Sequence, residues 1–313
     1  MADSTMPAQL DGDGRVAPKP FQSRIQDLVY NVDVGPGHQA VKVALYVLMV
    51  LMVMLFYTAT QFRGLREQDP MDAAQLGRNL LYYKQYATQC VRPLSIGYLE
   101  RKTGRRPPIL VGHPELIRPP LYPAVLAVMF KLTAPPFKVE PKPGVFPAEQ
   151  RAVIPFNLGM TLLTGLLLFF LARRLFDRRV GFLSTTVFFL SDTVWNSSIS
   201  GSGTALLMLL TVGTVYSALA ASSVLREKQP PRRAVVLLLL ASALTAAAFL
   251  TRYAMAVLVP AIALLIGVYV GGRRGRRWAG LYAAVAATLV LPWIARNIMV
   301  CRAPLGLAPV MAL

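Results

Sequence analysis

The chain has 313 residues, of which 55% are hydrophobic and only 15% are charged. This composition leaves too little polar surface to cover a soluble core of this size, so it excludes an ordinary soluble domain and predicts an integral membrane protein. The net charge of +18 would suit a nucleic-acid partner, but the positive charge lies in short clusters between apolar segments, as in membrane proteins, and we expect no nucleic-acid binding.

The N-terminal residues 1–40 begin as a polar stretch with Pro and Gly, and we predict a flexible cytoplasmic tail there. Residues 41–313 form a membrane domain in which seven segments approach the roughly 20 apolar residues that a helix needs to cross a bilayer. The predicted spans are Val41–Thr60, Ala152–Leu171, Val180–Ser197, Thr204–Val224, Ala234–Leu250, Ala254–Val270 and Trp278–Ile298. The sequence thus predicts an all-α integral membrane protein with about seven transmembrane helices, surrounded by membrane lipids.

The short loops between these spans alternate in charge. Arginines crowd the loops near residues 173–179, 226–233 and 273–277, whereas the alternate loops, such as Ser191–Gly203, contain one Arg or none. Short basic loops stay in the cytoplasm, so we expect the arginine-rich loops and the N-terminus inside. The chain is then a multi-pass protein of the cell membrane whose long first loop, residues 61–150, is extracytoplasmic.

One apolar segment inside this loop tests that orientation. Pro119–Thr133 begins with two prolines, contains Lys131 and is shorter than a span, which predicts a juxtamembrane helix at the membrane surface. If it crossed the membrane instead, residues 61–118 would be cytoplasmic, and their Lys and Arg would also satisfy the charge rule. Charge alone leaves both alternatives open, and length favours the surface helix. Residues 134–150 are Pro-rich and are predicted to be extended.

The densest group of ionisable residues follows the first span. Asp69 directly precedes Pro70, and an Asp before a first-turn proline is a favoured helix cap. Asp72 then falls in the first turn, where a carboxylate suits the helix dipole. Ionisable residues beside a membrane are also functional candidates. Asp69 therefore has two interpretations, helix cap and functional residue.

Several motifs, taken in order, resemble a known family. The segment Asp69–Asn79 has the pattern D-x-M-D-x-A-Q-x-G-R-N, and His113–Pro123 reads HPELIRPPLYP. Further matches follow at TQCVRPLS (88–95), LARRLFDRRV (171–180), LTRYA (250–254), PWIARN (292–297) and PLGLA (304–308). Over roughly residues 40–310 this order resembles polytopic GT-C glycosyltransferases of the glycosyltransferase family 39 type, which include protein O-mannosyltransferase-like and aminoarabinose-transferase-like enzymes.

The resemblance implies an enzyme that moves a hexosyl or pentosyl group from a polyprenyl-phosphate carrier to a lipid, glycan or protein acceptor at the outer face of the membrane. It implies that Asp69 is the catalytic base, since an attacking hydroxyl must lose its proton, and it makes Asp72 and Asp192 the candidates for a second acid. The leaving phosphate needs cations, and Arg118, Arg252 and Arg296, all at predicted outer helix ends, are the candidates. Arginines at such positions also snorkel to the interface without any function, and that alternative stays open for each of the three.

The cofactor is unknown from the sequence. His38 and His113 are isolated and Cys90 and Cys301 lie far apart, so the pattern offers no zinc site. A divalent metal held by Asp69 and the lipid phosphate would suit the preference of such ions for carboxylate and phosphate oxygens.

Two departures from the family pattern bear on activity. Asp192 lies a few residues before SGSGT (200–204), the stretch that matches the family's next outer loop and that contains no acid here. Relatives usually continue with several more spans, so the resemblance implies a chain that is short at its C-terminus: a paralogue, a fragment or a truncated product. The rival functions are a transporter or lipid flippase, for which the sequence shows no clear internal repeat, and a non-catalytic truncated membrane partner.

Overall fold

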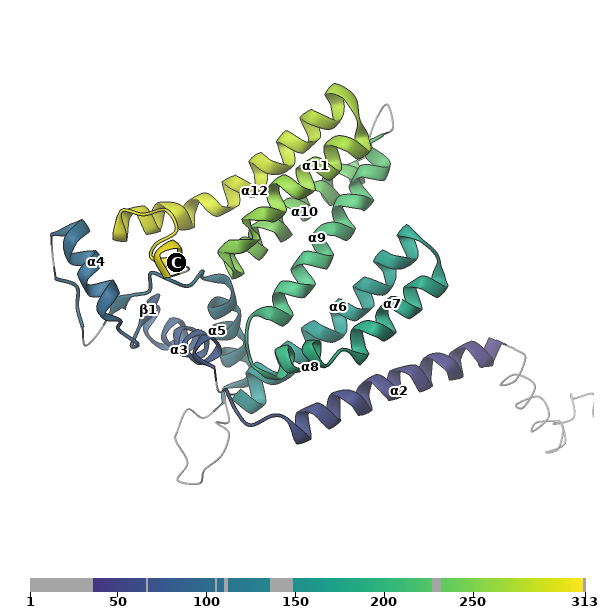
Figure 1. Ribbon diagram of the computed structural model, residues 1–313, viewed down its shortest axis with the longest axis horizontal. Helices are drawn as coiled ribbons and strands as arrows, with labels where there is room; N and C mark the ends of the chain where they lie inside the picture. The colour runs from purple at the N-terminus through teal and green to yellow at the C-terminus, as the bar shows by residue number, and fades with distance from the viewer. Residues whose placement is uncertain are drawn as a thin grey trace, which may run out of the picture. The chain divides into compact units, whose positions relative to one another are not determined.

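The computed structural model describes residues 36–65, 67–104, 106–109, 112–135, 149–226 and 232–311. These residues are mostly helical (Figure 1) and belong to two compact units, one ending at Phe56 and the other beginning at Tyr57. The elements from α3 onward belong to the second unit, as do the last residues of α2, residues 57–60. Three predictions fall partly outside the described residues: most of the N-terminal tail, most of the Pro-rich stretch and the centre of the second arginine-rich loop.

The elements confirm an all-α protein, to which the described residues add one short antiparallel strand pair that joins Ala87 to Pro114 and Thr88 to His113. In chain order they are α2 (Pro36–Thr60), α3 (Gln68–Tyr83), β1 (Ala87–Thr88), α4 (Pro93–Thr103), β2 (His113–Pro114), α5 (Leu121–Thr133), η1 (Glu149–Val153), α6 (Ile154–Leu175), α7 (Arg178–Leu190), α8 (Asp192–Ile199), α9 (Thr204–Leu225), α10 (Arg232–Thr251), η2 (Tyr253–Val257), α11 (Leu258–Val270), α12 (Gly272–Cys301) and α13 (Ala308–Met311).

Among the described residues, six helical segments are long and apolar enough to cross a membrane. They are Ala40–Thr60, Arg151–Leu175, Thr204–Leu225, Arg232–Thr251, Tyr253–Val270 and Gly272–Cys301. Each overlaps most or all of a predicted span, because a sustained apolar run both forms a helix and suits the hydrocarbon layer. The chain is therefore a multi-pass helical membrane protein.

The predicted third span, Val180–Ser197, is not one helix, so the number seven is not confirmed. The chain forms α7 and α8 there, with Ser191 in extended backbone between them (φ −75°, ψ 118°). At 1.5 Å per residue, the 13 residues of α7 reach about 20 Å, which is less than the hydrocarbon thickness of about 30 Å. The fully buried Trp195 holds the break, because its Nε1 donates to the Phe189 carbonyl at 2.6 Å.

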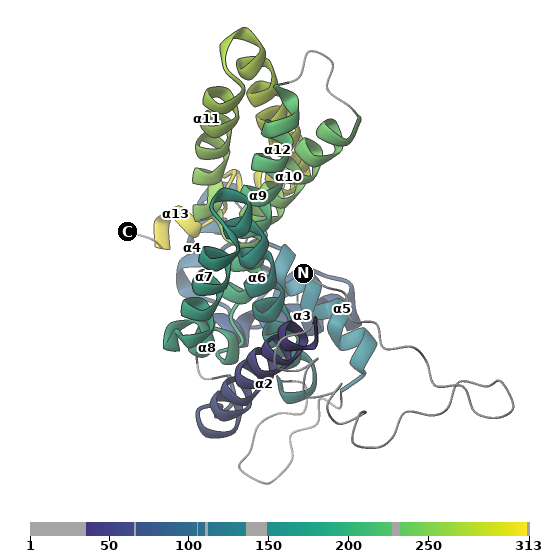
Figure 2. The same cartoon turned by 90° about the vertical axis from the view of Figure 1, so that its right-hand side faces the viewer.

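The long helices pack through small side chains. α9 lies along α10, and α12 lies along both α10 and α11 (Figures 1 and 2). The buried face of α9 includes Gly213, Ser217, Ala218 and Ala221, and such residues let membrane helices approach closely. This packing also aligns the helix ends, so that Gly203, just before α9, lies beside Thr251 at the end of α10.

A smaller packing unit joins α3 to α5. A Cβ added at Gly77 of α3 would lie 3.0 Å from the Leu126 Cβ and 3.1 Å from the Pro123 carbonyl, so glycine is what permits this approach. α5 has 13 residues and reaches about 20 Å, which confirms that the segment is too short to span. Its place at the membrane surface stays a prediction.

The ends of the helices gather at two opposite ends of the second unit. One end holds the α6–α7 and α11–α12 turns, the end of α9 and the start of α10, and we call it the arginine-rich end (Figure 1). The other holds α3, α5, α8, η2 and the C-terminal segment, and we call it the loop end. The candidate site residues Asp69, Asp192 and Arg252 lie at the loop end.

Candidate active site

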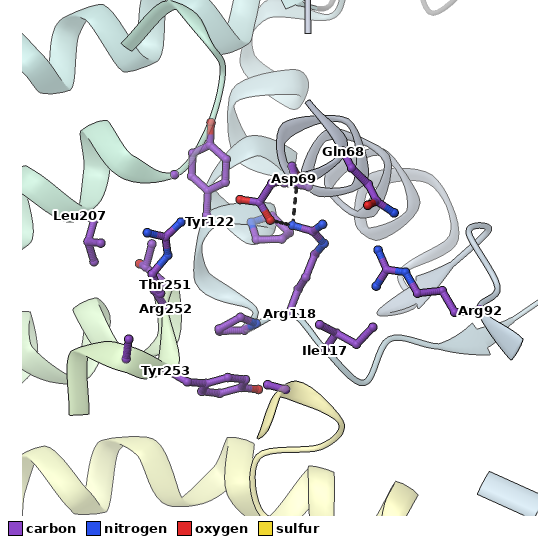
Figure 3. A pocket seen from close by; sticks show the side chains of 16 residues that line it. Gln68, Asp69, Arg92, Ile117, Arg118, Tyr122, Leu207, Thr251, Arg252 and Tyr253 are labelled. Atoms are coloured by element: carbon purple, nitrogen blue, oxygen red, sulfur yellow. Dashed lines mark hydrogen bonds and ion pairs between the residues drawn. The ribbon is translucent and has the colours of Figure 1, made fainter. Parts of the chain in front are cut away.

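A cavity of about 550 Å³ lies at the loop end. Residues from α3, the segment before α5, the start of α9 and the α10–η2 junction line it, and Ala308 of α13 contributes as well. Figure 3 shows the Arg118 and Arg252 side chains on either side of the Asp69 carboxylate. Residues far apart in the sequence therefore meet at one space.

Asp69 lies in the first turn of α3 and does not cap it. The N-cap position is Glu67, and the first backbone hydrogen bond runs from the Met71 N–H to the Glu67 carbonyl at 3.3 Å. The expected cap at Asp69 is therefore wrong. The helix begins earlier than expected, and Pro70 fits inside its first turn because an N–H there needs no helical partner. The Asp69 carboxylate instead pairs with Arg118 (Figure 3).

Asp72 also departs from its expected place. It lies beyond the first turn and is 9% exposed, and its Oδ2 accepts from Nη2 of Arg92 and from Nη2 of Arg118, each at 3.0 Å. Burial raises the pKa of Asp72 above its ordinary value, while the charge of Arg92 opposes the shift. Asp72 does not line the cavity. Asp72 holds two arginines and does not lie in the first turn, so its interpretation as a dipole-stabilising residue is wrong, while its role as a second acid stays a prediction.

Arg118 lies at the cavity wall, and one of its hydrogen-bond donors has no acceptor among the described residues. Its Nη1 also donates to the Asp69 carbonyl at 3.1 Å, and burial lowers its pKa to about 10, so it remains a cation at neutral pH. Its Nε is buried and has no hydrogen-bond partner among the described residues. A buried donor without an acceptor is unfavourable, so this atom would gain from an anion in the cavity.

The backbone beneath Arg118 is fixed by the buried Glu115. The Glu115 Oε1 accepts from the Ile117 N–H at 2.7 Å and from the Arg118 N–H at 3.1 Å. Burial raises the pKa of Glu115, although those two N–H groups favour the charged form. On the other side, the single proton of the Tyr86 hydroxyl is shared between the Arg118 and Pro119 carbonyls, whose oxygens lie at 3.1 and 2.9 Å. The segment is therefore held rigidly from two directions.

The C-terminal segment braces the same loop. The Leu307 N–H donates to the Leu116 carbonyl at 2.8 Å, and Leu307 is fully buried. Gly306 makes this close approach in the left-handed region (φ 63°), which favours glycine. The motif PLGLA therefore forms part of the support of the Arg118 loop.

The two other predicted phosphate ligands differ in position. Arg252 lines the cavity and is exposed, and its guanidinium makes no hydrogen bond or ion pair with the described residues. Arg296 does not line the cavity: its Nη1 donates to the Glu115 carbonyl at 2.9 Å, and its guanidinium lies over the Trp293 ring at 4.9 Å from the centroid. Arg252 therefore stays a phosphate candidate, whereas Arg296 supports the loop that carries Arg118.

A second cavity of about 430 Å³ adjoins Asp69 and contains Asp192, the other predicted second acid. Asp69 and Arg252 line both cavities. The buried Tyr122 fixes the turn between α8 and α9 by donating to the Gly201 carbonyl at 2.6 Å, and Asn157 donates to the Ser202 carbonyl at 3.0 Å. The two cavities thus share one carboxylate and one arginine.

Sequence reasoning missed Arg92, Glu115 and Tyr122. All three lie inside the motifs TQCVRPLS and HPELIRPPLYP, which were the available signal. Within the described residues no three His, Cys, Asp or Glu side chains form a cluster that could hold a metal ion. A divalent ion bound by Asp69 and a lipid phosphate would need no such cluster, so metal dependence stays open.

Comparison with known proteins identifies the family of the chain. The model of the dolichyl-phosphate-mannose-protein mannosyltransferase family matches residues 118–296, more than half of the chain, beginning at Arg118 and ending at Arg296. No curated protein and no solved structure matches. With its membrane-spanning helices and the cavity that Arg118 lines, the chain belongs to the dolichyl-phosphate-mannose-protein mannosyltransferase family and is a membrane glycosyltransferase of the GT-C type.

Proposed function

We propose that this glycosyltransferase takes a sugar from a polyprenyl-phosphate carrier and transfers it to an acceptor hydroxyl at the outer face of the membrane. The observation that carries the proposal is the meeting of Asp69 with Arg118 in the larger cavity. A carboxylate can take a proton, and an arginine can stabilise a leaving phosphate, so the pair supplies both requirements of the reaction.

The cavity lining supports a lipid phosphate as the leaving group. Arg92, Arg118 and Arg252 provide positive charge, and the unpartnered Nε of Arg118 is a donor that a phosphate oxygen would satisfy. Leu207 and Ile117 supply apolar wall for the first carbons of the carrier. An amphiphilic ligand of this kind needs both surfaces within one cavity.

The reaction then runs as a displacement at the anomeric carbon. The acceptor oxygen bonds to that carbon as the bond from the carbon to the phosphate oxygen breaks, and the phosphate leaves with the electron pair. Asp69 takes the hydroxyl proton.

The test is Asp69→Asn, assayed as sugar transfer from a mixture of labelled polyprenyl-phosphate sugars by purified protein in lipid nanodiscs. Asparagine is the same size but takes no proton at neutral pH, and general-base catalysis is worth about 10²–10⁴-fold, so we expect a loss on the order of a hundredfold or more. The matched control is Asp177→Asn at the arginine-rich end. Asp177 caps α7 by accepting from the Val180 N–H at 2.8 Å, and asparagine caps about as well.

The two variants separate chemistry from folding. Both should unfold at the wild-type temperature, and only Asp69→Asn should lose transfer. An active wild-type chain and an equally active Asp69→Asn variant would remove Asp69 from catalysis. A wild-type chain that transfers none of the offered sugars to any acceptor in the membrane would count against the function itself.

A further inference from the structure

The second cavity differs in kind from the first. Within the described part of the chain, every residue that lines it has a polar side chain, among them Glu67, Asp69, Asp192, Asn196 and Arg252, with serines and threonines between them. The larger cavity, by contrast, has Leu207, Ile117 and several prolines and alanines in its lining. The described lining of the second cavity offers no apolar side chain against which a polyprenyl chain could pack. This cavity therefore suits a polar part of a substrate.

The break between α7 and α8 builds this cavity. Because α8 starts anew after Ser191, Asp192 and Asn196 lie one turn apart on the same helix face, and the Asn196 Nδ2 donates to Asp192 Oδ2 at 2.7 Å. The Tyr57 hydroxyl donates to Asp192 Oδ1 at 2.7 Å. Each carboxylate oxygen accepts one of these bonds and keeps a free lone pair for a ligand.

The turn that follows α8 supplies hydroxyl groups. Ser202 donates to the Thr204 Oγ1 at 3.0 Å, and Ser200 donates to the Ser197 carbonyl at 2.9 Å. Each hydroxyl oxygen retains acceptor capacity after donating its proton. Tyr122 and Asn157 anchor the turn through the Gly201 and Ser202 carbonyls. The serine and threonine hydroxyls are therefore held in place before any ligand binds.

The charge balance identifies the ligand class. Among the described lining residues, three carboxylates, from Glu67, Asp69 and Asp192, lie with one arginine, Arg252. In the part of the chain that the structure describes, only Asp69 of the three is paired with a further arginine, Arg118, so the carboxylates still outnumber the arginines and would repel an anion. Carboxylates, amides and hydroxyls together both accept and donate hydrogen bonds at close spacing, as the hydroxyls of a sugar require. The ligand that suits the cavity is therefore neutral and rich in hydroxyl groups.

We propose that the second cavity is a saccharide subsite in which Asp192 and Asn196 bind the hydroxyls of a sugar and present it to Asp69. The inference rests on the proposed function, since the shared Asp69 joins this subsite to the lipid-phosphate cavity. The sugar is either the one carried by the donor or part of a glycan acceptor, and both offer the same hydroxyl chemistry.

Binding is tested directly with methyl glycosides of common hexoses and pentoses, added to the full chain in nanodiscs and followed by saturation-transfer NMR. Asp192→Asn should weaken binding about tenfold, because a charge-assisted hydrogen bond becomes a neutral one. Asn196→Phe, at an exposed helix position, should block the cavity and abolish binding. Asp177→Asn should bind as the wild type does. Binding of a sugar-free polyprenyl phosphate should be unchanged in all three variants.

Transfer kinetics then separate the two sources of the sugar. A higher KM for the acceptor in Asp192→Asn assigns the subsite to the acceptor, and a higher KM for the donor assigns it to the donor's sugar. Wild-type glycoside binding and wild-type KM values for both substrates in Asn196→Phe would overturn the proposal, as would a wild-type chain that binds no glycoside. Glycoside binding that depends on Asp192 in a chain without transferase activity would keep the subsite and remove the proposed function.

Discussion

The two ends of the second unit differ in how far their arginines are exposed and in how they are paired. At the arginine-rich end, Arg178, Arg226 and Arg277 are exposed, and Arg226 lies over the Tyr269 ring at 5.0 Å. At the loop end, Arg92 and Arg118 share the buried Asp72, with side chains only 19% and 14% exposed. Exposed arginines are solvated and gain little from fixed partners, whereas buried ones need carboxylates and carbonyls. The same residue type is therefore exposed at one end and, as Arg92 and Arg118, built into the candidate site at the other.

The largest effect should come from a direct test of which end faces out. Cys90 is exposed near β1 at the loop end, and Cys301 is buried. An impermeant maleimide applied to intact cells should label the native chain, and Cys90→Ser should abolish the label. Arg226→Cys in the Cys90→Ser chain should react only after the cells are permeabilised. The reverse pattern would invert the topology and put the site inside the cell.

Next in size is the removal of one buried arginine. Arg118→Ala loses a charge-assisted hydrogen bond to phosphate, worth about 1.5–3 kcal/mol, so polyprenyl phosphate should bind roughly ten- to a hundredfold more weakly. Arg178→Ala, at an exposed position of the other end, should bind normally. Equal affinities of the two folded variants for polyprenyl phosphate would mean that Arg118 has a structural role and does not bind the phosphate.

How far the sequence predicts this arrangement depends on the range of the forces involved. The long helices follow from local apolarity, and their positions were predicted because a hydropathic run needs no tertiary information. The break at Ser191 was not predicted, because it depends on the buried Trp195, whose Nε1 donates to the Phe189 carbonyl, and on the Asn196–Asp192 hydrogen bond.

For the site, the family resemblance implied that Asp69, Arg118, Arg252 and Arg296 belong to one site, and the first three line one cavity. Their catalytic and binding roles stay predictions. The pairing of Asp69 with Arg118 could not be predicted, since 49 residues separate them and only the packing of α3 on α5 brings them together. Arg296 was selected for its place at a helix end, but the direction of its side chain depends on helix rotation, which hydropathy does not give.

A smaller effect is expected when the shared carboxylate is neutralised. Asp72→Asn removes the charge that holds Arg92 and Arg118, but Arg118 keeps its bonds to Asp69, so donor affinity should fall only about three- to tenfold. The readout is a higher KM for the donor with a nearly unchanged kcat. A loss of kcat as large as that of Asp69→Asn would instead make Asp72 an acid of the reaction, as the sequence had allowed.

The smallest effect should be a pH dependence of stability that comes from Glu115. Burial raises its carboxyl pKa in the folded chain, so the folded chain holds a proton that the unfolded chain releases at a lower pH. The carboxyl therefore lowers stability as the pH rises through the interval between the two pKa values, and it has no such effect below both. Glu115→Gln keeps an oxygen for the Ile117 and Arg118 N–H groups but has no proton to release. Melting temperatures of the wild type should thus fall relative to Glu115→Gln as the pH rises through this interval, and parallel curves would show that the buried carboxyl is not protonated more readily in the folded chain.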